Sequence, residues 1–578
     1  MIYVGWDADR RVAALATDEN VILLGLDRWD DFHYKTTFPT TCRINGSKVE
    51  LEAIQILVAG EMVTSDHLDE CIANGWDGIF PIPETAYVSV PAAMTFYEQL
   101  DGHLGHATTL SVAAALKDAS YMVWIQDDDE SRALTNTEGF RKSLQRERGA
   151  VTAYLNLWKF FSNAGISVGS FSFRFRTALG RINSLDLEFP PDSLLPHDIH
   201  VLIGPNGIGK SQALLQLVEH WLSTEPSMDA KVGFAETVNL NKVIVVSYSP
   251  FESFPLDTGD KGSRRDHGVY RYFGLRGFRK VFNEGGVGEE KIRLSQSRPK
   301  ANAAESLVAC VEDDQRYGAI RDWSAKVATM ERVLRSAIDF DYAAVKVWNF
   351  PNEEVFFEDE HGVGEDAVIT VPTSPNSSDD EFITYIPITA DRVSALKPDF
   401  IRHHMHAGAG VVFLKGGKPI ELSSGQRLFS YIVVNILGAI RRNSLVVIDE
   451  PELFLHPTLE IAFISMLKTI LTSYRSKALL ATHSLVTVRE LPRDCVHVFE
   501  RTENGIVVNR PPFETFGGDV QRISSYVFGD KSVSKPFESW IREKLLQFGS
   551  PEALIAALGD NINEEMIIQI SAMGAGQW

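Results

Sequence analysis

Runs of hydrophobic and polar positions along the chain predict a mixed α/β protein. Residues 170–176 and 185–189 alternate between apolar and polar side chains, which is typical of strands buried on one face. Other runs are almost entirely apolar, as expected of parallel strands covered on both faces; they lie at 243–248, 444–448 and 479–482. Helical patterns at 211–221 and 427–440 lie among these strands, so the sequence indicates a parallel sheet with flanking helices.

The first 165 residues predict a separate α+β domain of unknown role. Their hydrophobic runs indicate two strands, at 11–17 and 21–25, around a polar turn. A helix at 110–116 and a buried strand at 121–125 follow. Four acids follow at 127–130 and could hold a divalent cation. A solvated loop explains them better, because no second cluster of ligands lies nearby in the sequence.

Composition narrows the class of protein. Of the 578 residues, 44% are hydrophobic and 23% are charged, which is enough apolar mass to fill several cores and excludes a largely disordered chain. The net charge of −21 argues against a surface that is basic everywhere, although a local basic strip remains possible. The 4 cysteines lie far apart and favour reduced, buried thiols over a zinc site or a disulfide framework.

The sequence also bears on a membrane location. No apolar run approaches the roughly 18 residues that cross a bilayer. Charged residues follow Met1 too early for a secretory signal peptide. We therefore expect a cytoplasmic protein with no membrane partner.

A glycine-rich loop at 204–211 carries the strongest chemical signal. It matches G-x-x-x-x-G-K-[ST], with an apolar strand before it and a helix after it, which leaves little room for a chance match. Backbone N–H groups and the helix N-terminus can gather phosphate oxygens, while Lys210 pairs with the β- and γ-phosphates and Ser211 ligates Mg²⁺. All positions of the loop are predicted ATP-binding residues: Gly204, Pro205, Asn206, Gly207, Ile208, Gly209, Lys210 and Ser211.

Two acids, Asp449 and Glu450, follow the apolar run at 444–448. The carboxyl end of a buried parallel strand is where phosphate chemistry takes place in α/β proteins. Asp449 is placed to hold Mg²⁺, directly or through water, and Glu450 is placed to polarise the attacking water as general base. Two acids that merely cap a core strand would explain the pair equally well in isolation. Together with the phosphate loop, the catalytic interpretation is favoured.

Further motifs complete a set in a fixed order. Leu-Ser-Ser-Gly-Gln at 422–426 opens the apolar helix, Pro-Glu-Leu-Phe-Leu-His-Pro at 451–457 follows the acidic pair, and Ala-Thr-His-Ser ends at 484. With the phosphate loop, this set resembles the ABC-type ATPase superfamily, and its wording looks like the soluble branch of SMC-like, RecF-like and OLD-like ATPases. The resemblance covers roughly 165–530. It implies an α/β fold, an ABC-type P-loop NTPase head with a mixed central sheet, flanking helices and an antiparallel β subdomain.

The resemblance further implies a site shared between two copies of the chain. The signature residues of one copy would reach the γ-phosphate of ATP held by the other; these are Ser423, Ser424, Gly425 and Gln426. His483 matches the histidine that contacts the γ-phosphate and orients the water, so we expect it to be catalytic beside Glu450. Two ATP molecules would then be held between two heads, with ATP joining the dimer and hydrolysis releasing it.

The sequence departs from the family pattern in two places. Ser424 replaces the usual first glycine of the signature, a change that soluble members tolerate. The family also carries a glutamine after the strand expected at 243–248, and none stands there. Ser249 and Glu252 are the candidates to replace it.

Three domains follow from these assignments: an N-terminal α+β domain at 1–165, the ATPase domain at 166–535, and a helical tail at 536–578. The ATPase domain contains an insertion at about 255–415. Its best helical pattern runs from Ile320 to Ile338. The insertion shows no sustained heptad pattern, which excludes a long coiled-coil arm in this space.

A basic, aromatic strip at 261–280 invites two interpretations. Seven basic residues stand against one acid: Lys261, Arg264, Arg265, Arg271, Arg276, Arg279 and Lys280 against Asp266. Interleaved aromatic residues would suit nucleic acid, and a lid or partner-docking surface explains the same residues slightly better in an acidic protein. Three histidines at 403, 404 and 406 could suggest a metal, but without a nearby carboxylate or cysteine we expect ordinary surface or core histidines.

The segment at 515–529 resembles one in OLD-like and defence-associated ATPases, yet the tail leaves no space for the Toprim nuclease of OLD enzymes. The chain thus resembles the ATPase subunits of Septu-type and retron-associated anti-phage systems, which work with a separate effector. We expect an ATP-hydrolysing switch that dimerises around ATP and Mg²⁺ and controls a nuclease or toxin. Two alternatives stay open: a DNA repair or recombination ATPase acting directly on DNA, and a scaffold that binds ATP without turnover.

Overall fold

The structure is a computed structural model that describes most of the chain. The described residues form two compact units, Met1–Gly517 and Gly518–Trp578. They are residues 1–6, 12, 16, 20–27, 33–164, 168–191, 193–223, 231–236, 238–257, 268–282, 288–321, 323–348, 353–358, 367–372, 382–503, 505–528 and 536–575.

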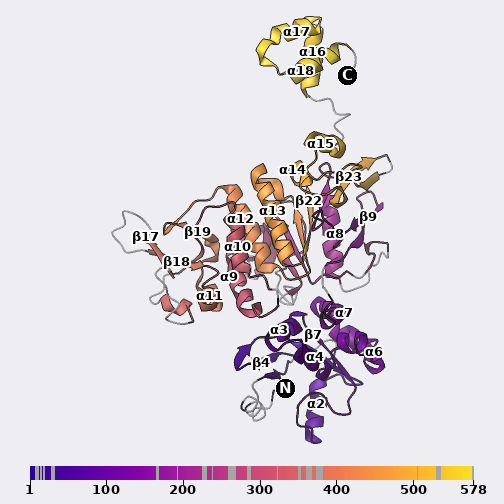
Figure 1. Cartoon of the computed structure of the whole chain (residues 1–578), viewed down its shortest axis with the longest axis vertical. Helices are drawn as coiled ribbons and strands as arrows, with labels where there is room; N and C mark the ends of the chain where they lie inside the picture. Colours follow the sequence, from indigo (N-terminus) through magenta and orange to yellow (C-terminus); the bar gives the residue numbers. More distant parts are fainter. Residues whose placement is uncertain are drawn as a thin grey trace. The chain divides into compact units, whose positions relative to one another are not determined.

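A seven-stranded sheet forms the centre of the first unit (Figure 1). Every neighbouring pair of strands is parallel except the last, where β24 runs antiparallel to β23. In spatial order the strands are β13 (Tyr270–Gly274), β12 (Lys242–Ser247), β21 (Ser444–Asp449), β22 (Lys477–Thr482), β10 (Ile199–Ile203), β23 (Val496–Thr502) and β24 (Gly505–Asn509). The strands predicted at 243–248, 444–448 and 479–482 are therefore neighbours in one sheet.

Helices cover both faces of this sheet. Helix α8 (Lys210–Leu222) lies on one face, and α12 (Ser424–Ala439) and α13 (Pro457–Ser473) lie on the other (Figure 1). The first face also packs against a small antiparallel sheet, β11 (Gly233–Phe234), β8 (Phe171–Arg176) and β9 (Ile182–Leu187). The mixed sheet, its helices and the antiparallel layer confirm the predicted fold class.

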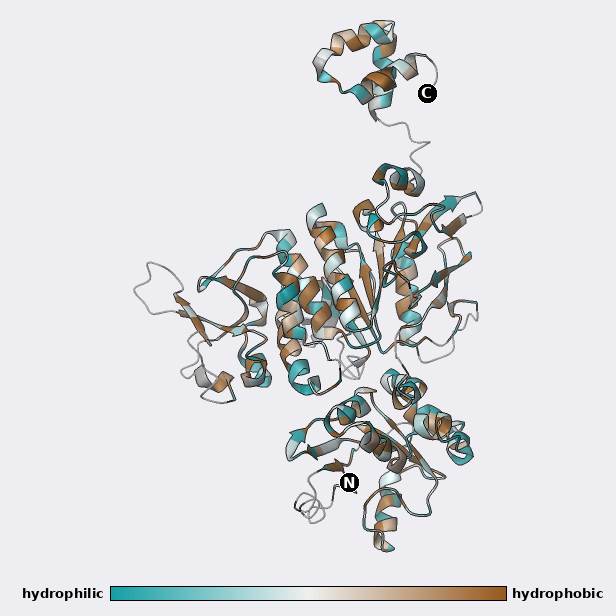
Figure 2. Cartoon of the chain, viewed as in Figure 1, coloured by the Kyte–Doolittle hydropathy of each residue, from teal (hydrophilic) through white to brown (hydrophobic). Residues whose placement is uncertain are grey.

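Hydropathy follows this layering. The central strands are hydrophobic along their length, and the helices turn polar residues outward (Figure 2). Burial of both sheet faces explains why the sequence of these strands is continuously apolar rather than alternating. No helix among the described residues is long and apolar enough to span a membrane.

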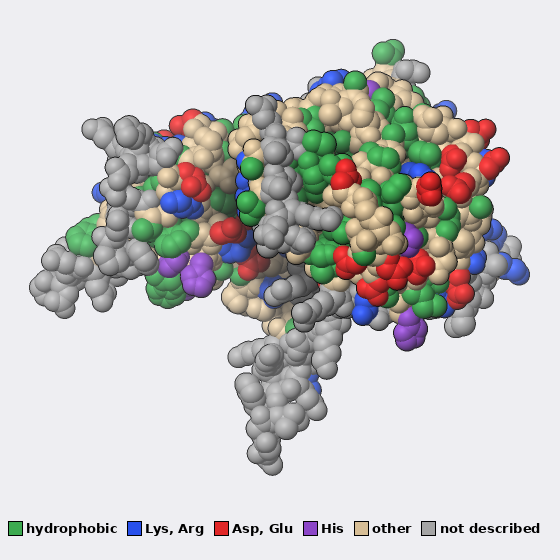
Figure 3. Space-filling view, turned by 90° about the horizontal axis from the view of Figure 1, so that it is seen from below, with side chains coloured by type: hydrophobic (Ala, Val, Ile, Leu, Met, Phe, Trp, Pro, Cys, Tyr) green, Lys and Arg blue, Asp and Glu red, His purple; other side chains and the backbone are tan. Residues whose placement is uncertain are grey.

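The N-terminal region builds its own core from residues between Ile2 and Phe161. One sheet contains β1 (Ile2–Val4), β2 (Val21–Leu24), β4 (Thr40–Ile44) and β5 (Ser47–Val49), and a second contains β3 (Thr37–Phe38), β6 (Ile54–Val58) and β7 (Tyr87–Pro91). The helices are α2 (Thr64–Ala73), α3 (Thr95–Leu104), α4 (His106–Ala115), α5 (Ala119–Trp124), α6 (Asp129–Thr135) and α7 (Arg148–Phe161), with a π-helical turn at Phe140–Leu144. Acidic side chains gather on part of the face shown in Figure 3, in keeping with the negative net charge.

Two N-terminal expectations need correction. The apolar run at 121–125 was expected to form a strand, but it lies in helix α5. Asp118 caps this helix by accepting a hydrogen bond from the backbone N–H of Tyr121 at 3.0 Å. A short apolar run by itself is compatible with either a helix or a strand, and here the cap favours the helix. The acids at 127–130 were expected in a solvated loop. Asp129 and Glu130 instead begin α6, and Asp128 caps it by accepting from the N–H of Ser131 at 2.8 Å, while the side chains of Asp127, Asp129 and Glu130 are exposed as expected. The expected strand at 11–17 falls mostly outside the described residues.

The insertion contains a hairpin, helices and a second sheet. The hairpin is β14 (Arg276–Phe282) and β15 (Gly288–Leu294), and the sheet is β17 (Ile369–Pro372), β18 (Phe382–Ile388), β16 (Tyr342–Val347), β19 (Val411–Lys415) and β20 (Lys418–Pro419). The helices are α9 (Arg298–Tyr317), α10 (Lys326–Leu334) and α11 (Pro398–His404).

The single helix expected at 320–338 is wrong, because α10 begins only at Lys326. The carboxylate of Asp314 accepts hydrogen bonds from the backbone N–H groups of Lys326 and Val327 and from the indole of Trp323, which fixes the helix start. The longest helix in the described part of the chain is α9, with 20 residues.

The second unit is helical. It contains α15 (Val520–Phe528), α16 (Pro536–Phe548), α17 (Pro551–Leu558) and α18 (Glu564–Gly574). The last three helices bury a small core of their own around Ile541, Leu554 and Ile570.

Candidate functional site

The phosphate loop lies between β10 and α8, as the sequence predicts. Gly204 has a φ of +153°, and a Cβ there would lie 2.5 Å from the carbonyl oxygen of Phe499. Gly209 stands at the helix N-cap with a left-handed φ of 101°. Both positions require glycine, because a side chain would clash or strain the backbone. The loop can therefore turn sharply and present the first N–H groups of α8 to an anion.

Lys210 points back across this loop. Its amine donates hydrogen bonds to the carbonyl oxygens of Gly204 and Pro205 at 3.0 and 3.2 Å, and it lies 2.8 Å from Nε2 of His483. Burial lowers the pKa of Lys210 to about 8, while the nearby carboxylates act in the opposite direction. The residue is thus a cation held at the mouth of the phosphate loop.

Ser211 and Asp449 meet beside it. The Ser211 hydroxyl donates to Oδ1 of Asp449 at 2.8 Å, joining the start of α8 to the end of β21. Burial raises the pKa of Asp449 to about 6, and Glu450 adds to that effect. A hydroxyl and a carboxylate oxygen in contact are a donor set that suits Mg²⁺, which prefers oxygen ligands.

Glu450 takes an unusual backbone conformation. Its φ of 52° and ψ of 56° place it in the left-handed region, and its N–H donates to the carbonyl of Ala481 at 2.9 Å. This turn directs the side chain to the pocket, where its Oε1 lies 4.0 Å from Nε2 of His483. Left-handed backbone in a residue other than glycine is costly and is often found at functional sites.

His483 follows the end of β22, which lies between β10 and β21 in the sheet. Its backbone N–H donates to Oε1 of Glu452 at 2.5 Å. Burial and the neighbouring Lys210 lower the pKa of His483 to about 4, so the imidazole is neutral near pH 7. A neutral ring can accept a proton or a hydrogen bond at Nε2, as its contact with Lys210 requires.

Lys210, Ser211, Glu450 and His483 line one pocket of about 840 Å³, whereas the predicted site residues Gly204, Pro205 and Asp449 are not in its lining. The sequence predictions Asn206 to Ser211, Glu450 and His483 are all in its wall. The pocket also exposes residues that sequence reasoning missed, namely Arg176 at the end of β8, Gln216 and His220 on α8. Gln216 accepts from the N–H of Arg176 at 2.9 Å and so ties the antiparallel sheet to the phosphate-loop helix. Only their position on segments adjoining the loop could have suggested them.

The signature segment lies at the start of α12. Ser423 and Gln426 form a reciprocal capping box, in which each side chain accepts from the other's backbone N–H at 3.2 Å. Ser423 and Ser424 are exposed, while Gly425 is buried. None of the described residues that line the nucleotide pocket comes from 422–426. In a single chain the structure therefore does not bring the signature residues together with the phosphate loop.

Neither candidate for the missing glutamine lies in the pocket wall. Glu252 is buried and pairs with Arg276 at 3.0 Å, and it accepts a hydrogen bond from the hydroxyl of Tyr272. Ser249 is buried outside the lining of the pocket. Glu252 therefore stabilises the fold around β13, and neither Ser249 nor Glu252 replaces the glutamine at the pocket.

The structure does not support a nucleic-acid surface on the described part of the basic strip at 261–280. Arg276 pairs with Glu252, and Arg271 pairs with Asp257 at 2.9 Å, so neither offers a free charge to nucleic acid. Tyr270, Tyr272 and Phe273 are buried in the core instead of exposed for stacking. Residues 261–267 lie outside the described residues.

The histidines of the insertion behave as ordinary packing residues. His404 stacks on Phe400 with ring centroids 4.1 Å apart, and His406 packs against Trp348. Among the described residues no group of histidines, cysteines and acids could hold a metal ion. The four cysteines are free thiols, as expected.

A family model matches residues 337–489 of the chain; it is described as "AAA domain, putative AbiEii toxin, Type IV TA system". The matched range contains the signature, the acidic strand and His483. A curated relative, protein ea59 of Escherichia phage lambda, is 23% identical over 535 residues and covers 89% of this chain and 87% of its own length. The family match supports an ATPase domain of the AAA type in this part of the chain.

Solved structures with a similar arrangement include the SMC head domain from Thermotoga maritima, with 8% identity, a TM-score of 0.25, and coverage of 60% of this chain and 100% of that one. An SMC head bound to the C-terminal winged-helix domain of ScpA gives 8% identity and a TM-score of 0.27, covering 60% and 98%. UvrA2 from Deinococcus radiodurans gives 12% identity and a TM-score of 0.25, covering 71% and 43%.

Proposed function

We propose that this chain, which carries an ATPase domain of the AAA/ABC type, binds ATP with Mg²⁺ and hydrolyses it between two copies of itself. The observation that carries the proposal is the convergence of Lys210, Ser211, Asp449, Glu450 and His483 at one end of three neighbouring strands. Phosphate-binding N–H groups, a cation, a carboxylate pair and a neutral imidazole are the groups that phosphoryl transfer to water requires.

Each residue has a distinct proposed role. Lys210 and the N–H groups of the loop bind the β- and γ-phosphates, and Ser211 with Asp449 would hold the Mg²⁺ that neutralises phosphate charge. Glu450 accepts the proton of the attacking water as general base. His483 donates or accepts a hydrogen bond at the γ-phosphate and positions that water. The presence of both Glu450 and His483 favours turnover over a scaffold that only binds ATP.

The dimer follows from what one chain lacks. The signature residues Ser423 to Gln426 lie outside the pocket lining, and Ser423 and Ser424 are exposed at the start of α12. A second copy that brings this exposed helix end to the pocket would add N–H donors at the γ-phosphate. Head-to-head pairing with twofold symmetry would complete two equal sites.

Complementation between two inactive variants tests this arrangement. Lys210→Ala removes the phosphate cation, and Ser423→Arg blocks the signature. In a mixed dimer both defects fall in the same site, so the other site is intact. Each variant alone should be inactive, whereas a 1:1 mixture should regain about a quarter of the wild-type rate, because half of the dimers hold one intact site of two. A mixture as inactive as its parts would contradict a shared site. As a control for dilution of one variant by another chain, Glu503→Gln takes the place of one of the two variants in the mixture; Glu503 is an exposed glutamate outside the site.

We further propose that the ATP cycle controls a separate effector, a nuclease or toxin, in anti-phage defence. The description of the matching family names a toxin of a toxin–antitoxin system, and the curated relative is carried by a phage, which fits a role in conflict between phages and hosts. Plating of phages on cells that carry the gene and its neighbours tests the proposal. Protection that disappears with Glu450→Gln supports it, and protection unchanged by that substitution contradicts it.

A further inference from the structure

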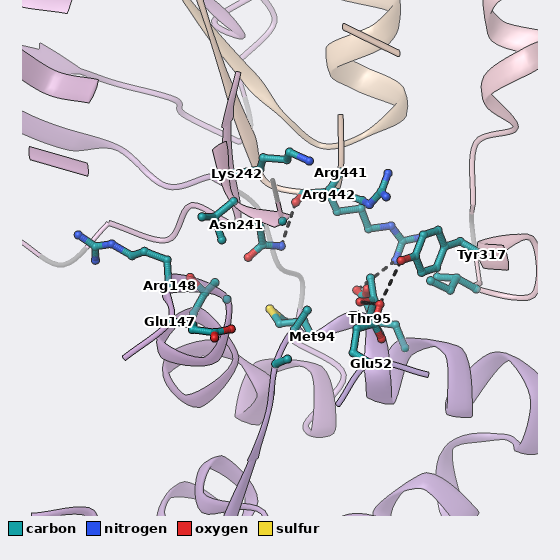
Figure 4. A pocket seen from close by; sticks show the side chains of 18 of the residues that line it. Glu52, Met94, Thr95, Glu147, Arg148, Asn241, Lys242, Tyr317, Arg441 and Arg442 are labelled. Atoms are coloured by element: carbon teal, nitrogen blue, oxygen red, sulfur yellow. Dashed lines mark hydrogen bonds and ion pairs between the residues drawn. The ribbon is translucent and has the colours of Figure 1, made fainter. Parts of the chain in front are cut away.

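A second cavity, of about 630 Å³, lies between the N-terminal region and the central sheet (Figure 4). On the sheet side it is lined by Asn241 and Lys242 at the start of β12 and by Arg441 and Arg442 just before β21. These are the amino ends of the strands, whereas the nucleotide pocket lies at their carboxyl ends. The cavity is thus at the opposite edge of the sheet from the proposed ATP site.

The N-terminal region closes the other side. Figure 4 shows Glu52, Met94, Thr95 and Glu147 facing the sheet residues across the cavity. Tyr317, at the end of α9, donates to Oε1 of Glu52 at 3.0 Å and so holds the two walls together. Volumes of about 300 to 1,000 Å³ are typical of small-molecule sites, which also tend to form where domains meet.

The wall of the cavity has an excess of positive charge. Among the described residues, six basic side chains and three acidic ones line it: Arg146, Arg148, Lys242, Arg316, Arg441 and Arg442 against Glu52, Glu98 and Glu147. Burial raises the pKa of Glu98, while the charge of Arg442, whose Nη1 lies 3.9 Å from Oε1 of Glu98, acts in the opposite direction.

A buried cation cluster adjoins the sheet side of the wall. Lys326 and Arg441 both pair with one carboxylate, that of Asp313. Lys242 is a third basic residue near this group. Burial and the charges of Arg441, Arg271 and Lys326 lower the pKa of its amine, and the charge of Asp313 acts in the opposite direction. Three basic side chains therefore lie near one carboxylate in the protein interior, and two of them pair with it.

Lys242 is the residue left without a partner. It is 5% exposed, and its amine makes no hydrogen bond or ion pair with any described residue. Nearby, Oδ1 of Asn241 is buried and also accepts no hydrogen bond in the described part of the chain. Burying an unpaired amine and an unpaired amide oxygen costs free energy, so their retention needs an explanation.

We propose that this cavity binds a small phosphorylated molecule, with a phosphate on Lys242. A phosphate brings the negative charge that the cluster of Lys242, Lys326 and Arg441 lacks, and it accepts several hydrogen bonds at once. Met94, Tyr317 and Trp323 supply an apolar part of the wall for the rest of the ligand. This site goes beyond the proposed ATPase and does not depend on it.

Binding of inorganic pyrophosphate tests the phosphate position. The measurement is isothermal titration with the full chain carrying Lys210→Ala, which removes the phosphate cation of the ATP site. Pyrophosphate should still bind to this variant, and adding Lys242→Met should weaken the binding at least about tenfold, as expected for loss of a charged hydrogen bond. Adding Lys418→Met instead, at an exposed lysine in β20, should leave it unchanged.

A second readout separates ligand binding from damage to the fold. Burial and the neighbouring cations lower the pKa of Lys242, so pyrophosphate should raise that pKa and draw a proton onto the amine. Titrations in buffers of different ionisation enthalpy should show proton uptake that Lys242→Met abolishes. Without ligand, Lys242→Met should melt at the same or a higher temperature than its parent, because it removes an unpaired buried amine.

Three results would overturn the site. One is no pyrophosphate binding to the Lys210→Ala chain at millimolar concentration, which would leave the phosphate loop as the only phosphate site. Another is binding that Lys242→Met leaves intact. The third is a melting temperature that falls with Lys242→Met, since the lysine would then stabilise the fold and not await a ligand.

Discussion

The amine of Lys210 lies 2.8 Å from Nε2 of His483, although 273 positions separate the two residues in the sequence. Because β10 and β22 are adjacent parallel strands, the loop after one and the histidine after the other meet at the same edge of the sheet. The contact holds the cation and the imidazole together in the absence of a nucleotide. A γ-phosphate would compete for Lys210 and leave His483 free to contact the phosphate itself.

Replacing Lys210 with alanine should weaken ATP binding by about 10- to 150-fold, because it removes charged hydrogen bonds to phosphate oxygens. Titration with a fluorescent ATP analogue measures the change. The matched control is Lys418→Ala, an exposed lysine outside the pocket, which should bind as the wild type does. Equal affinity of the Lys210→Ala and wild-type chains would remove the assignment of the phosphate loop.

Replacing Glu450 with glutamine should lower the rate of hydrolysis by about 10²- to 10⁴-fold, the range that a general base contributes. ATP affinity should remain, because the amide keeps the shape of the side chain. With ATP the variant should therefore accumulate as a dimer, which light scattering after size-exclusion chromatography detects. Glu503→Gln should hydrolyse ATP at the normal rate. If Glu450→Gln hydrolyses ATP as fast as the wild type, another group is the base.

Replacing Asp313 with asparagine should destabilise the protein by about 3–5 kcal/mol, because it leaves Lys326 and Arg441 buried without an anion. Urea unfolding measures this change. Burial alone would raise the pKa of Asp313, but Arg441 and Lys326 outweigh it and hold the pKa at about 2.

The same carboxylate predicts a pH effect. Since its pKa is lower in the folded than in the unfolded chain, its contribution is present above about pH 4 and is lost as the pH falls towards 2, by about 2 kcal/mol. Asp399→Asn, at a fully exposed carboxylate, should change neither quantity. Identical acid unfolding of the wild type and Asp313→Asn would contradict the pairing.

A buried histidine pair predicts a second pH effect at milder pH. Nδ1 of His200 and Nε2 of His497 lie 3.0 Å apart between β10 and β23, and burial lowers both pKa values, that of His497 to about 3. The unfolded chain therefore takes up protons first, so stability is greatest above about pH 6.5 and falls below it. The loss from pH 6.5 to 5.5 should be about 2 kcal/mol for two such groups.

His497→Gln should reduce that loss to about 1 kcal/mol, because one titrating group is removed and the amide can still hydrogen-bond to His200. Urea unfolding at the two pH values measures the difference. His403→Gln, at an exposed histidine, should leave the loss unchanged. A pH dependence equal in His497→Gln and the wild type would show that the pair does not control it.

Motifs with a local physical cause could be predicted from the sequence. The phosphate loop between strand and helix and the acids after a buried strand depend on neighbouring residues alone, and the structure has them where the pattern places them. The short apolar run at 121–125 could not be assigned in this way, because its helix depends on a cap from Asp118. The charges of Arg271 and Arg276 were also misjudged, since their partners Asp257 and Glu252 lie outside the basic strip and only folding brings them together.

The sequence by itself determined which strands are buried, because only strands covered on both faces are continuously apolar, and it determined the residue types needed to bind phosphate. Only the tertiary structure decided the order of the strands. That order brings Lys210, Asp449 and His483 to one edge of the sheet and leaves the signature exposed elsewhere. It also creates the cationic cavity at the opposite edge, since Lys242, Arg441 and the N-terminal region are distant in sequence and meet only through packing.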